Sequence, residues 1–184
     1  MNSITRRRLL GAAALAPLLP AAAFAQSAPM TPSCGKQTAR QTAGPFFKPS
    51  SPKRISLLEE NPKDRLVLQG VVLSPECKPV ANALLDFWHA DDFGEYDNQG
   101  FRYRGHQFTD AQGRYRLETI LPGEYPGRTR HFHVNVQAPG RRMLTTQLYI
   151  PGDAGNRRDA LYRPELVISM PKPGAASFDF VVDA

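Results

Sequence analysis

Short runs of alternating apolar and polar residues, separated by Gly and Pro, make up most of the chain after residue 64. Successive side chains on a strand point to opposite faces, so such runs predict β-strands. We expect strands at residues 65–73, 83–88, 114–118, 130–137, 145–150, 166–169 and 178–182. Residues 156–162 are compatible with one short helical turn, and no other window outside the N-terminal segment has a helical stripe. Many short strands joined by Gly/Pro turns predict an all-β sandwich.

The first 25 residues have a different pattern. Three arginines at 6–8 precede an apolar stretch that reaches Phe24 and an Ala-x-Ala ending. These features indicate a secretory signal peptide over residues 1–25, and the paired arginines indicate the twin-arginine export machinery. A membrane anchor is the alternative, although two prolines interrupt the apolar run. We expect a periplasmic or secreted protein, and the sequence leaves open whether the leader is cleaved.

The remaining residues are enough for one domain. Residues 26–64 are rich in Ser, Pro, Thr and Lys and have no sustained period, so we expect an N-terminal arm that wraps a β-sandwich of residues 65–184. The three leader arginines account for half of the net charge of +6. No basic run with interleaved aromatic residues follows them, which argues against a nucleic-acid partner.

The chain contains two cysteines, Cys34 and Cys77, and both lie outside the leader. In an oxidising compartment such a pair is more often a disulfide than two free thiols. We therefore expect a Cys34–Cys77 disulfide that joins the arm to the sandwich. Two free thiols remain the alternative, and two cysteines alone make a weak case for zinc.

A tyrosine, Tyr125, stands six positions before a His-x-His pair. On a strand, His131 and His133 share one face, while Phe132 and Val134 share the other. Two imidazoles that project together are suited to bind a metal ion. The alternative is one exposed histidine and one core histidine. Two of the chain's four histidines on one face, next to a tyrosine, favour the metal.

Several motifs surround this pattern. They are Phe87-Trp-His-Ala-Asp91, Gly94-Glu-Tyr96, Tyr103-Arg-Gly105, Thr109-Asp-Ala-Gln-Gly113 and Thr119-Ile-Leu-Pro-Gly-Glu-Tyr125-Pro126. Together they resemble the catalytic domain of the intradiol ring-cleavage dioxygenases, the family of protocatechuate 3,4-dioxygenase and catechol 1,2-dioxygenase. The resemblance runs from about Gln41 to Ile150 and implies a β-sandwich of that type.

In that family, two tyrosinates and two histidines hold a non-haem Fe(III) ion, and the matching positions here are Tyr96, Tyr125, His131 and His133. Chemistry supports this set independently, because phenolates are hard anionic donors that favour Fe(III) and imidazoles complete the shell without adding charge. Taken alone, Tyr96 would be interpreted as a loop aromatic and Tyr125 as a packed turn residue. Their joint appearance with the histidines favours the iron site.

The resemblance also implies catalytic roles for Arg128, beside the substrate ring, and for Gln147, in the wall of the active site. The ordinary alternatives are a solvated loop cation and a polar strand residue. Two other histidines, His89 and His106, are interpreted as non-ligands. Three arginines, Arg102, Arg104 and Arg130, are interpreted as surface charges, with contact to an anionic substituent of the substrate as the alternative.

The reaction implied by the resemblance is cleavage of a catechol-type ring by O2, between the two hydroxylated carbons, to a muconate-type diacid. A homo-oligomer is compatible with it. Catechol-type members carry an N-terminal helical domain that is not expected here, and export is unusual in the family, so the identity of the catechol stays open. The alternative is a non-catalytic prealbumin-like module. Such modules share the turn residues but have no reason to carry Tyr96, Arg128 or the histidine pair.

Overall fold

Strands account for most of the regular structure in the computed structural model, which describes residues 34–184. The strands are β1 (Arg65–Leu73), β2 (Leu84–Trp88), β3 (Arg104–Phe108), β4 (Arg114–Ile120), β5 (His131–Gln137), β6 (Leu144–Tyr149), β7 (Ser169–Lys172), β8 (Ala175–Ser177) and β9 (Phe180–Val181). Two short 3-10 helices, η1 (Ala154–Arg157) and η2 (Pro164–Leu166), lie between β6 and β7. Among these residues no helix is long and apolar enough to cross a membrane.

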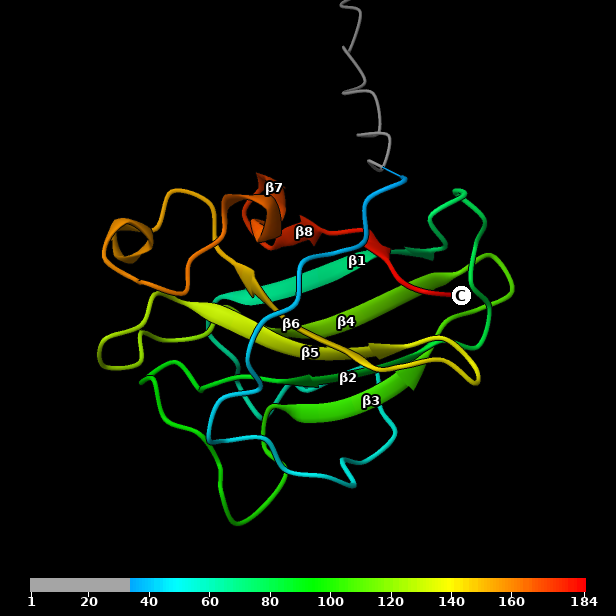
Figure 1. Cartoon of the computed structure of the whole chain (residues 1–184). Coiled ribbons are helices and arrows are strands. Elements are labelled where there is room, and N and C mark those ends of the chain that lie inside the picture. The colour runs from blue at the N-terminus through cyan, green and yellow to red at the C-terminus, as the bar shows by residue number, and fades with distance from the viewer. Residues whose placement is uncertain (1–33) are drawn as a thin grey trace, which may run out of the picture. The chain divides into compact units, whose positions relative to one another are not determined.

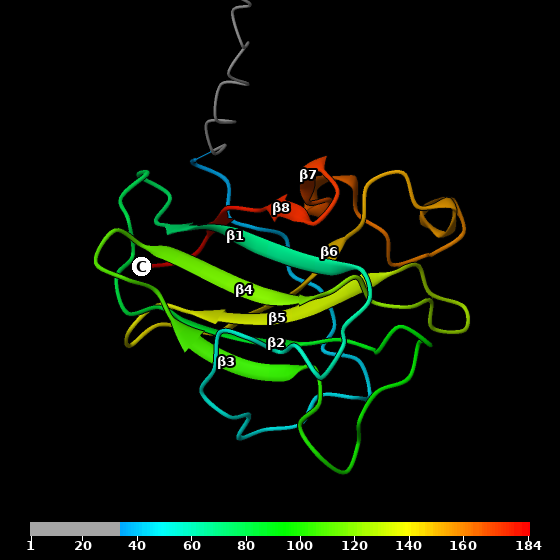
Figure 2. The ribbon, with the colours of Figure 1, turned by 180° about the vertical axis from the view of Figure 1, so that it is seen from behind.

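The strands form two layers, which Figures 1 and 2 show from opposite sides. One sheet has the order β4-β1-β8-β7, with β9 also paired to β1, and the other has the order β3-β2-β5-β6. Both sheets turn their apolar faces inward. Leu68 and Leu117 from the first sheet, and Leu85, Phe132 and Val134 from the second, are fully buried in the shared core. The predicted all-β sandwich is therefore confirmed.

Most expected strands are present with ends within two residues of the prediction, and β1 has the bounds expected from its alternation. The expected strand at residues 166–169 is wrong. Pro164 begins a 3-10 turn that includes Leu166, and the strand starts only at Ser169. β3 and β8 were not predicted. Gly105 interrupts the apolar pattern of β3, and β8 has only three small residues, so neither gives a strong signal.

The described part of the arm, residues 34–64, contains no named strand and runs along the sandwich. It first runs beside β9, where the Thr38 amide donates to the Val181 carbonyl, and then reaches the β6 edge, where the Gln41 amide donates to the Thr145 carbonyl. It then crosses the outer face of the four-stranded sheet and reaches the β3 edge, where the His106 amide donates to the Pro52 carbonyl. The arm therefore covers the outer face of this sheet.

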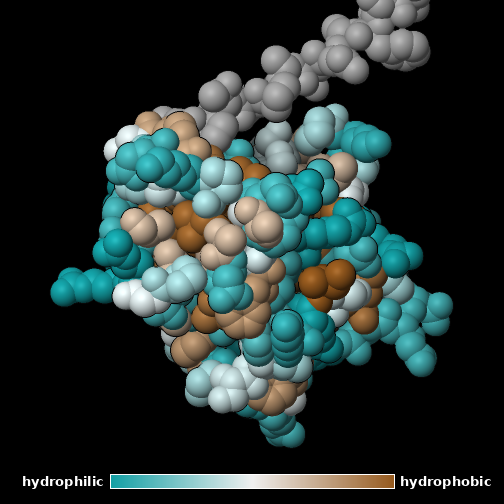
Figure 3. Space-filling view, turned by 90° about the vertical axis from the view of Figure 1, so that its right-hand side faces the viewer, coloured by the Kyte–Doolittle hydropathy of each residue, from teal (hydrophilic) through white to brown (hydrophobic). Residues whose placement is uncertain are grey.

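The Cys34–Cys77 disulfide is present, and it joins the start of the described arm to the turn after β1. Its two Cα atoms are 5.4 Å apart. The predicted signal peptide lies outside the described residues. Apolar side chains on the face in Figure 3 occur in small groups separated by polar ones.

Candidate metal centre

Strand β5 positions the two histidines of the His-x-His pair as its alternation predicts. Phe132 and Val134 point into the sandwich and are fully buried. His131 and His133 occupy the outer face, beneath the arm, and are 4% and 2% exposed. The arm buries the histidines on the side away from the core, since Gly44 lies against the His133 ring.

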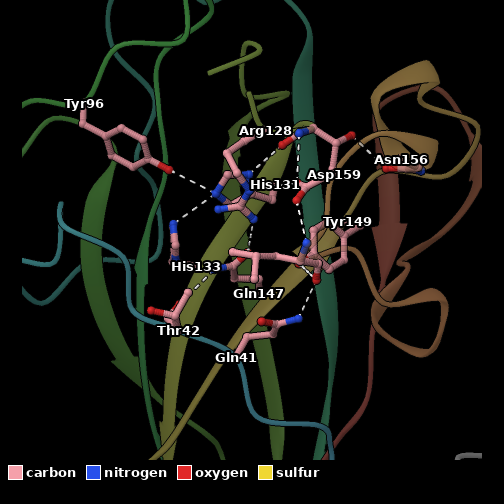
Figure 4. A network of polar contacts seen from close by, with 12 residues as sticks. Gln41, Thr42, Tyr96, Arg128, His131, His133, Gln147, Tyr149, Asn156 and Asp159 are labelled. Atoms are coloured by element: carbon pink, nitrogen blue, oxygen red, sulfur yellow. Dashed lines mark hydrogen bonds and ion pairs between the residues drawn. The ribbon is translucent and has the colours of Figure 1, made fainter. Parts of the chain in front are cut away.

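Three of the four predicted ligands converge on one point (Figure 4). The Nε2 atoms of His131 and His133 are 3.1 Å apart. The Tyr96 hydroxyl lies 3.4 Å from His131 Nε2. Tyr125 is close by, with its ring edge-on to Tyr96 at a centroid distance of 6.1 Å. The sequence-predicted set is thus brought together in space.

The two tyrosines lie on separate loops that pack against each other without intervening side chains. The Gly123 amide donates to the Asp91 carbonyl at 2.7 Å. A Cβ atom at Gly94 would lie 1.9 Å from the Glu124 carbonyl oxygen, and one at Gly123 would lie 2.5 Å from the Gly94 amide nitrogen. Glycine at both positions is therefore required for the loop of Tyr96 to approach the loop of Tyr125.

Burial keeps His131, His133 and Tyr96 in their neutral forms. It lowers the pKa of His131 to about 4, although the bond from Nδ1 to the Thr129 carbonyl acts in the opposite direction. Burial, followed by the neighbouring His131 and Arg128, also lowers the pKa of His133 well below its usual range. Burial raises the pKa of Tyr96. Neutral imidazoles carry the lone pairs that a metal needs, and a phenolate here requires a nearby cation.

The donors fit a metal ion. His131 Nδ1 donates to the Thr129 carbonyl at 2.6 Å, which leaves its Nε2 as an acceptor facing His133. His133 Nδ1 is buried and has no hydrogen-bond partner among residues 34–184. Either tautomer of His133 thus leaves a buried polar atom unsatisfied. A cation bound by both Nε2 atoms would use the lone pairs that these two nitrogens otherwise turn toward each other. The same residues contain no cluster of three His, Cys, Asp or Glu, so a metal here depends on the phenols.

Arg128 lies beside the donors and is fixed on two sides (Figure 4). Its Nε donates to Asp159 at 2.8 Å and its Nη2 donates to Gln147 Oε1 at 2.6 Å. The Gln147 amide in turn donates to the Thr42 carbonyl at 2.9 Å. Burial would raise the pKa of Asp159, but hydrogen bonds from the Leu161 amide, Arg128 and the Thr129 amide together lower it. The two residues that were each predicted to be catalytic are therefore in direct contact.

A cavity of about 460 Å³ opens beside these groups. Tyr125 and Arg128 line it, together with Thr129, Arg158 and Asp159. A cavity of this size is large enough for a single substituted aromatic ring. Its wall combines a phenol, a fixed guanidinium and an exposed arginine, so it suits a ring that carries oxygen substituents.

One cross-strand row forms the floor of the site. Arg104 of β3 pairs with Trp88 of β2, Trp88 with His133 of β5, and His133 with Gln147 of β6. The expectation that Arg104 is a surface charge is wrong, since it is only 2% exposed. Its Nε donates to the Asp97 carbonyl at 2.9 Å and its Nη1 to the Phe46 carbonyl at 2.7 Å. Arg104 therefore holds the Tyr96 loop and the arm against the sheet.

The other two arginines interpreted as surface charges are partly exposed. Arg102 pairs with Asp91 at 2.7 Å, and Arg130 lies 3.5 Å from Asp153. His89 uses both ring nitrogens within the protein, at Ala90 and Thr119. His106 Nδ1 donates to the Ser51 carbonyl at 2.8 Å.

Sequence reasoning did not find the residues that support the predicted ligands. Phe46 of the arm stacks on Tyr96 at 4.4 Å, and Tyr149 donates to the Leu161 carbonyl beside Gln147. Asp159 follows η1, in a segment without strand alternation. An acid in such a segment is ordinary on its own. Only the fold places it next to Arg128.

Comparison with known proteins identifies the class. Residues 43–181 match the family model Dioxygenase_C, which is described as dioxygenase, so the chain belongs to this dioxygenase family. It is 30% identical over 155 residues to catechol 1,2-dioxygenase of Acinetobacter baylyi, covering 68% of this chain and 50% of the relative. It is 38% identical over 109 residues to the protocatechuate 3,4-dioxygenase beta chain of Burkholderia cepacia, covering 49% and 46% of the two chains. The chain spans about half the length of the curated relatives it matches.

A solved structure with high similarity is the dioxygenase domain of a dioxygenase carbohydrate-binding protein fusion from Streptomyces sp. SirexAA-E. The two are 52% identical, the TM-score is 0.77, and the match covers 81% of this chain and 99% of that one. The 3-chlorocatechol 1,2-dioxygenase of Rhodococcus opacus 1CP is 29% identical, with a TM-score of 0.72 over 81% of this chain and 73% of that one. These likenesses agree with the sandwich and with the family assignment.

Proposed function

We propose that this protein is a non-haem Fe(III) dioxygenase that opens a catechol-type ring between its two hydroxylated carbons. One C–C bond of the ring breaks, both atoms of O2 enter the product, and each hydroxylated carbon becomes a carboxyl group of a muconate-type diacid. The observation that carries the proposal is the convergence of His131, His133 and Tyr96 beside the Arg128–Gln147 pair. Relatives named as catechol, chlorocatechol and hydroxyquinol 1,2-dioxygenases support the substrate class.

In this proposal Tyr96, Tyr125, His131 and His133 hold the iron. When bound, Fe(III) would accept the two catechol oxygens and withdraw electron density from the ring, which prepares a ring carbon to react with O2. The chain's own groups then have separate roles. Tyr125 borders the cavity, so as a metal-bound phenolate it would be placed to receive a catechol hydroxyl proton and become a neutral phenol.

Arg128 acts on charge in the substrate. Asp159 and Gln147 fix its guanidinium at the edge of the cavity, and its side chain is only 17% exposed. A preorganised cation in a site of low water content stabilises developing negative charge more strongly than one in bulk solvent. Gln147 therefore contributes as a residue that positions Arg128. The arm excludes water from the other side of the histidines.

The reaction is tested with purified, iron-loaded protein and a panel of catechol, protocatechuate, hydroxyquinol and chlorinated catechols. We expect loss of the aromatic ultraviolet band and a product heavier by two oxygen atoms, both labelled when the gas is 18O2. A colourless protein that binds no iron and consumes none of these compounds would instead favour the prealbumin-like module.

Iron ligation is tested by His133→Ala. The variant removes one of the two converging imidazoles, so we expect loss of the broad visible band of tyrosinate-bound Fe(III) and of most bound iron. Iron content by mass spectrometry and the visible spectrum check this. Stoichiometric iron with full colour in the variant would remove His133 from the ligand set.

We also infer export through the twin-arginine route. The arginines at 6–8 and the Ala-x-Ala ending support this, and so does the Cys34–Cys77 disulfide, since such bonds persist in oxidising compartments. Replacing Arg6 and Arg7 with lysine should leave the protein in the cytoplasm of a bacterial host. Cell fractionation, with free-thiol counting on unreduced periplasmic protein, checks both points. Two reactive thiols in the exported protein would rule out the disulfide there.

A further inference from the structure

The two histidines of the candidate metal centre are oriented by different means. His131 Nδ1 donates to the Thr129 carbonyl at 2.6 Å, which fixes both its tautomer and its ring plane. Metal-binding histidines almost always have such a partner for the second nitrogen. His133 Nδ1 has none among residues 34–184. The Thr42 backbone is near enough to raise the His133 pKa, but the contact does not form a hydrogen bond to Nδ1, and the Thr42 carbonyl accepts one from Gln147.

The face of the His133 ring is instead held by a flat contact with a second ring. The Trp88 indole stacks on the His133 imidazole with a centroid distance of 4.9 Å and an interplanar angle of 4°. The two residues are direct register partners on β2 and β5, so the backbone itself aligns their side chains. Phe47 of the arm packs on Trp88 at 4.9 Å and keeps the indole in place.

The burial of Trp88 indicates that its ring face, and not its indole N–H, makes the structural contribution. Trp88 is 2% exposed, yet its indole N–H is buried and has no hydrogen-bond partner among the described residues. A buried unpaired donor costs stability, and a smaller apolar side chain would avoid that cost. What the indole provides instead is a broad, rigid surface parallel to the imidazole.

We propose that Trp88 is the positioning residue for His133, and that it directs His133 Nε2 toward the metal by stacking rather than by hydrogen bonding. The inference rests on the iron centre of the proposed function. Gly44 lies on another edge of the same ring, where a Cβ atom would come within 3.4 Å of His133 Cε1. The imidazole is thus confined by the indole and the arm, and loss of the indole frees it to rotate about χ2.

The test compares Trp88→Leu, which keeps apolar bulk without a ring face, with Trp88→Phe, which keeps a ring. The control is Phe87→Leu, at the neighbouring position of β2, whose side chain is fully buried on the opposite face of the sheet. Iron retention is measured by competition with a chelator, together with the position of the visible band and the melting temperature of each variant. The readout is iron binding and not turnover.

We expect Trp88→Leu to weaken iron binding by about 10- to 100-fold, the range found when partners that orient a ligand histidine are removed. Trp88→Phe should stay within a few-fold of the wild type and keep its visible band. Phe87→Leu should lower the melting temperature without weakening iron binding. Equal iron binding in Trp88→Leu and the wild type would overturn the inference, and so would a folded Trp88→Phe that loses iron.

Trp88 is the only tryptophan of the chain, which gives a second measurement on the unmodified protein. Iron loading should quench most of the tryptophan emission, because the indole touches a ligand ring. Unchanged emission in a protein that has bound iron would overturn the inference even if Trp88→Leu does not fold. A wild-type protein that binds no iron at all would instead contradict the proposed function.

Discussion

At the scale of single residues, the site depends on side chains whose partners leave them little freedom. Arg128 is bound by Asp159 on one side and by Gln147 on the other, and Gln147 is itself bound to the arm at Thr42. A guanidinium has five donors in a rigid fork, so these two contacts fix its plane and leave donors for the cavity. The cation is therefore preorganised before any substrate enters.

Replacement of Arg128 tests this role. Arg128→Ala should keep iron and colour, because Arg128 is not in the predicted ligand set, but should lower turnover by roughly 10²- to 10³-fold, as typically follows the loss of one preorganised donor. Arg128→Lys should restore part of the rate, since it supplies the charge without the fork. Steady-state kinetics and the visible spectrum check this. Wild-type turnover in Arg128→Ala would show that Arg128 is a solvated loop cation with no catalytic role.

At the scale of secondary-structure elements, alternation in the sequence was enough to predict most strands and the shared face of His131 and His133. Alternation does not specify register. The row that joins Arg104, Trp88, His133 and Gln147 exists only because β3, β2, β5 and β6 pair in one particular alignment. This is why Arg104 was wrongly interpreted as a surface charge and why Trp88 attracted no interpretation. Long-range contacts of the arm, such as Phe46 on Tyr96, have no periodic signal at all.

Arg104 connects three elements, so its replacement should affect more than one of them. Arg104→Met keeps an apolar stem but leaves the Phe46 and Asp97 carbonyls without their donor, and we expect a loss of roughly 2–4 kcal/mol in the free energy of unfolding. Arg116→Met is the matched control, because its pair with Glu118 is exposed and should be worth at most about 1 kcal/mol.

Urea unfolding measures both Arg104→Met and its control, and amide exchange in the loop that carries Tyr96 reports whether that loop becomes mobile. We expect faster exchange there in Arg104→Met only. Equal stability losses in the two variants, with unchanged exchange in the loop, would show that Arg104 does not hold the loop.

At the scale of the whole molecule, a buried histidine connects the two sheets far from solvent. His89 follows β2 of the four-stranded sheet, and its Nε2 lies 2.6 Å from the Thr119 hydroxyl on β4 of the other sheet. Its Nδ1 donates to the Ala90 carbonyl at 2.7 Å. Both ring nitrogens are thus satisfied in the neutral form, and burial lowers the pKa of His89 to about 4. The fold therefore favours the neutral form of this histidine.

This preference predicts a pH dependence of stability in the iron-free protein. In the unfolded chain His89 titrates near its ordinary pKa of about 6.5, so between that pH and about 4 the unfolded state binds a proton that the folded state does not. The contribution of His89 to stability is therefore complete above about pH 6.5 and is lost as the pH falls toward 4. The slope from this one group is at most about 1.4 kcal/mol per pH unit.

His131 and His133 change stability in the same direction, so a variant is needed to separate His89 from them. His89→Gln replaces the imidazole by an amide that does not titrate and that can still bond to Thr119. We expect His89→Gln to be less stable than the wild type at pH 7, because it packs less well, and the gap to narrow as the pH falls below 6.5. Urea unfolding of both iron-free proteins at half-unit pH steps measures this. Parallel curves across that range would show that His89 stays neutral in the unfolded chain or is charged in the folded one, and either result contradicts the assignment.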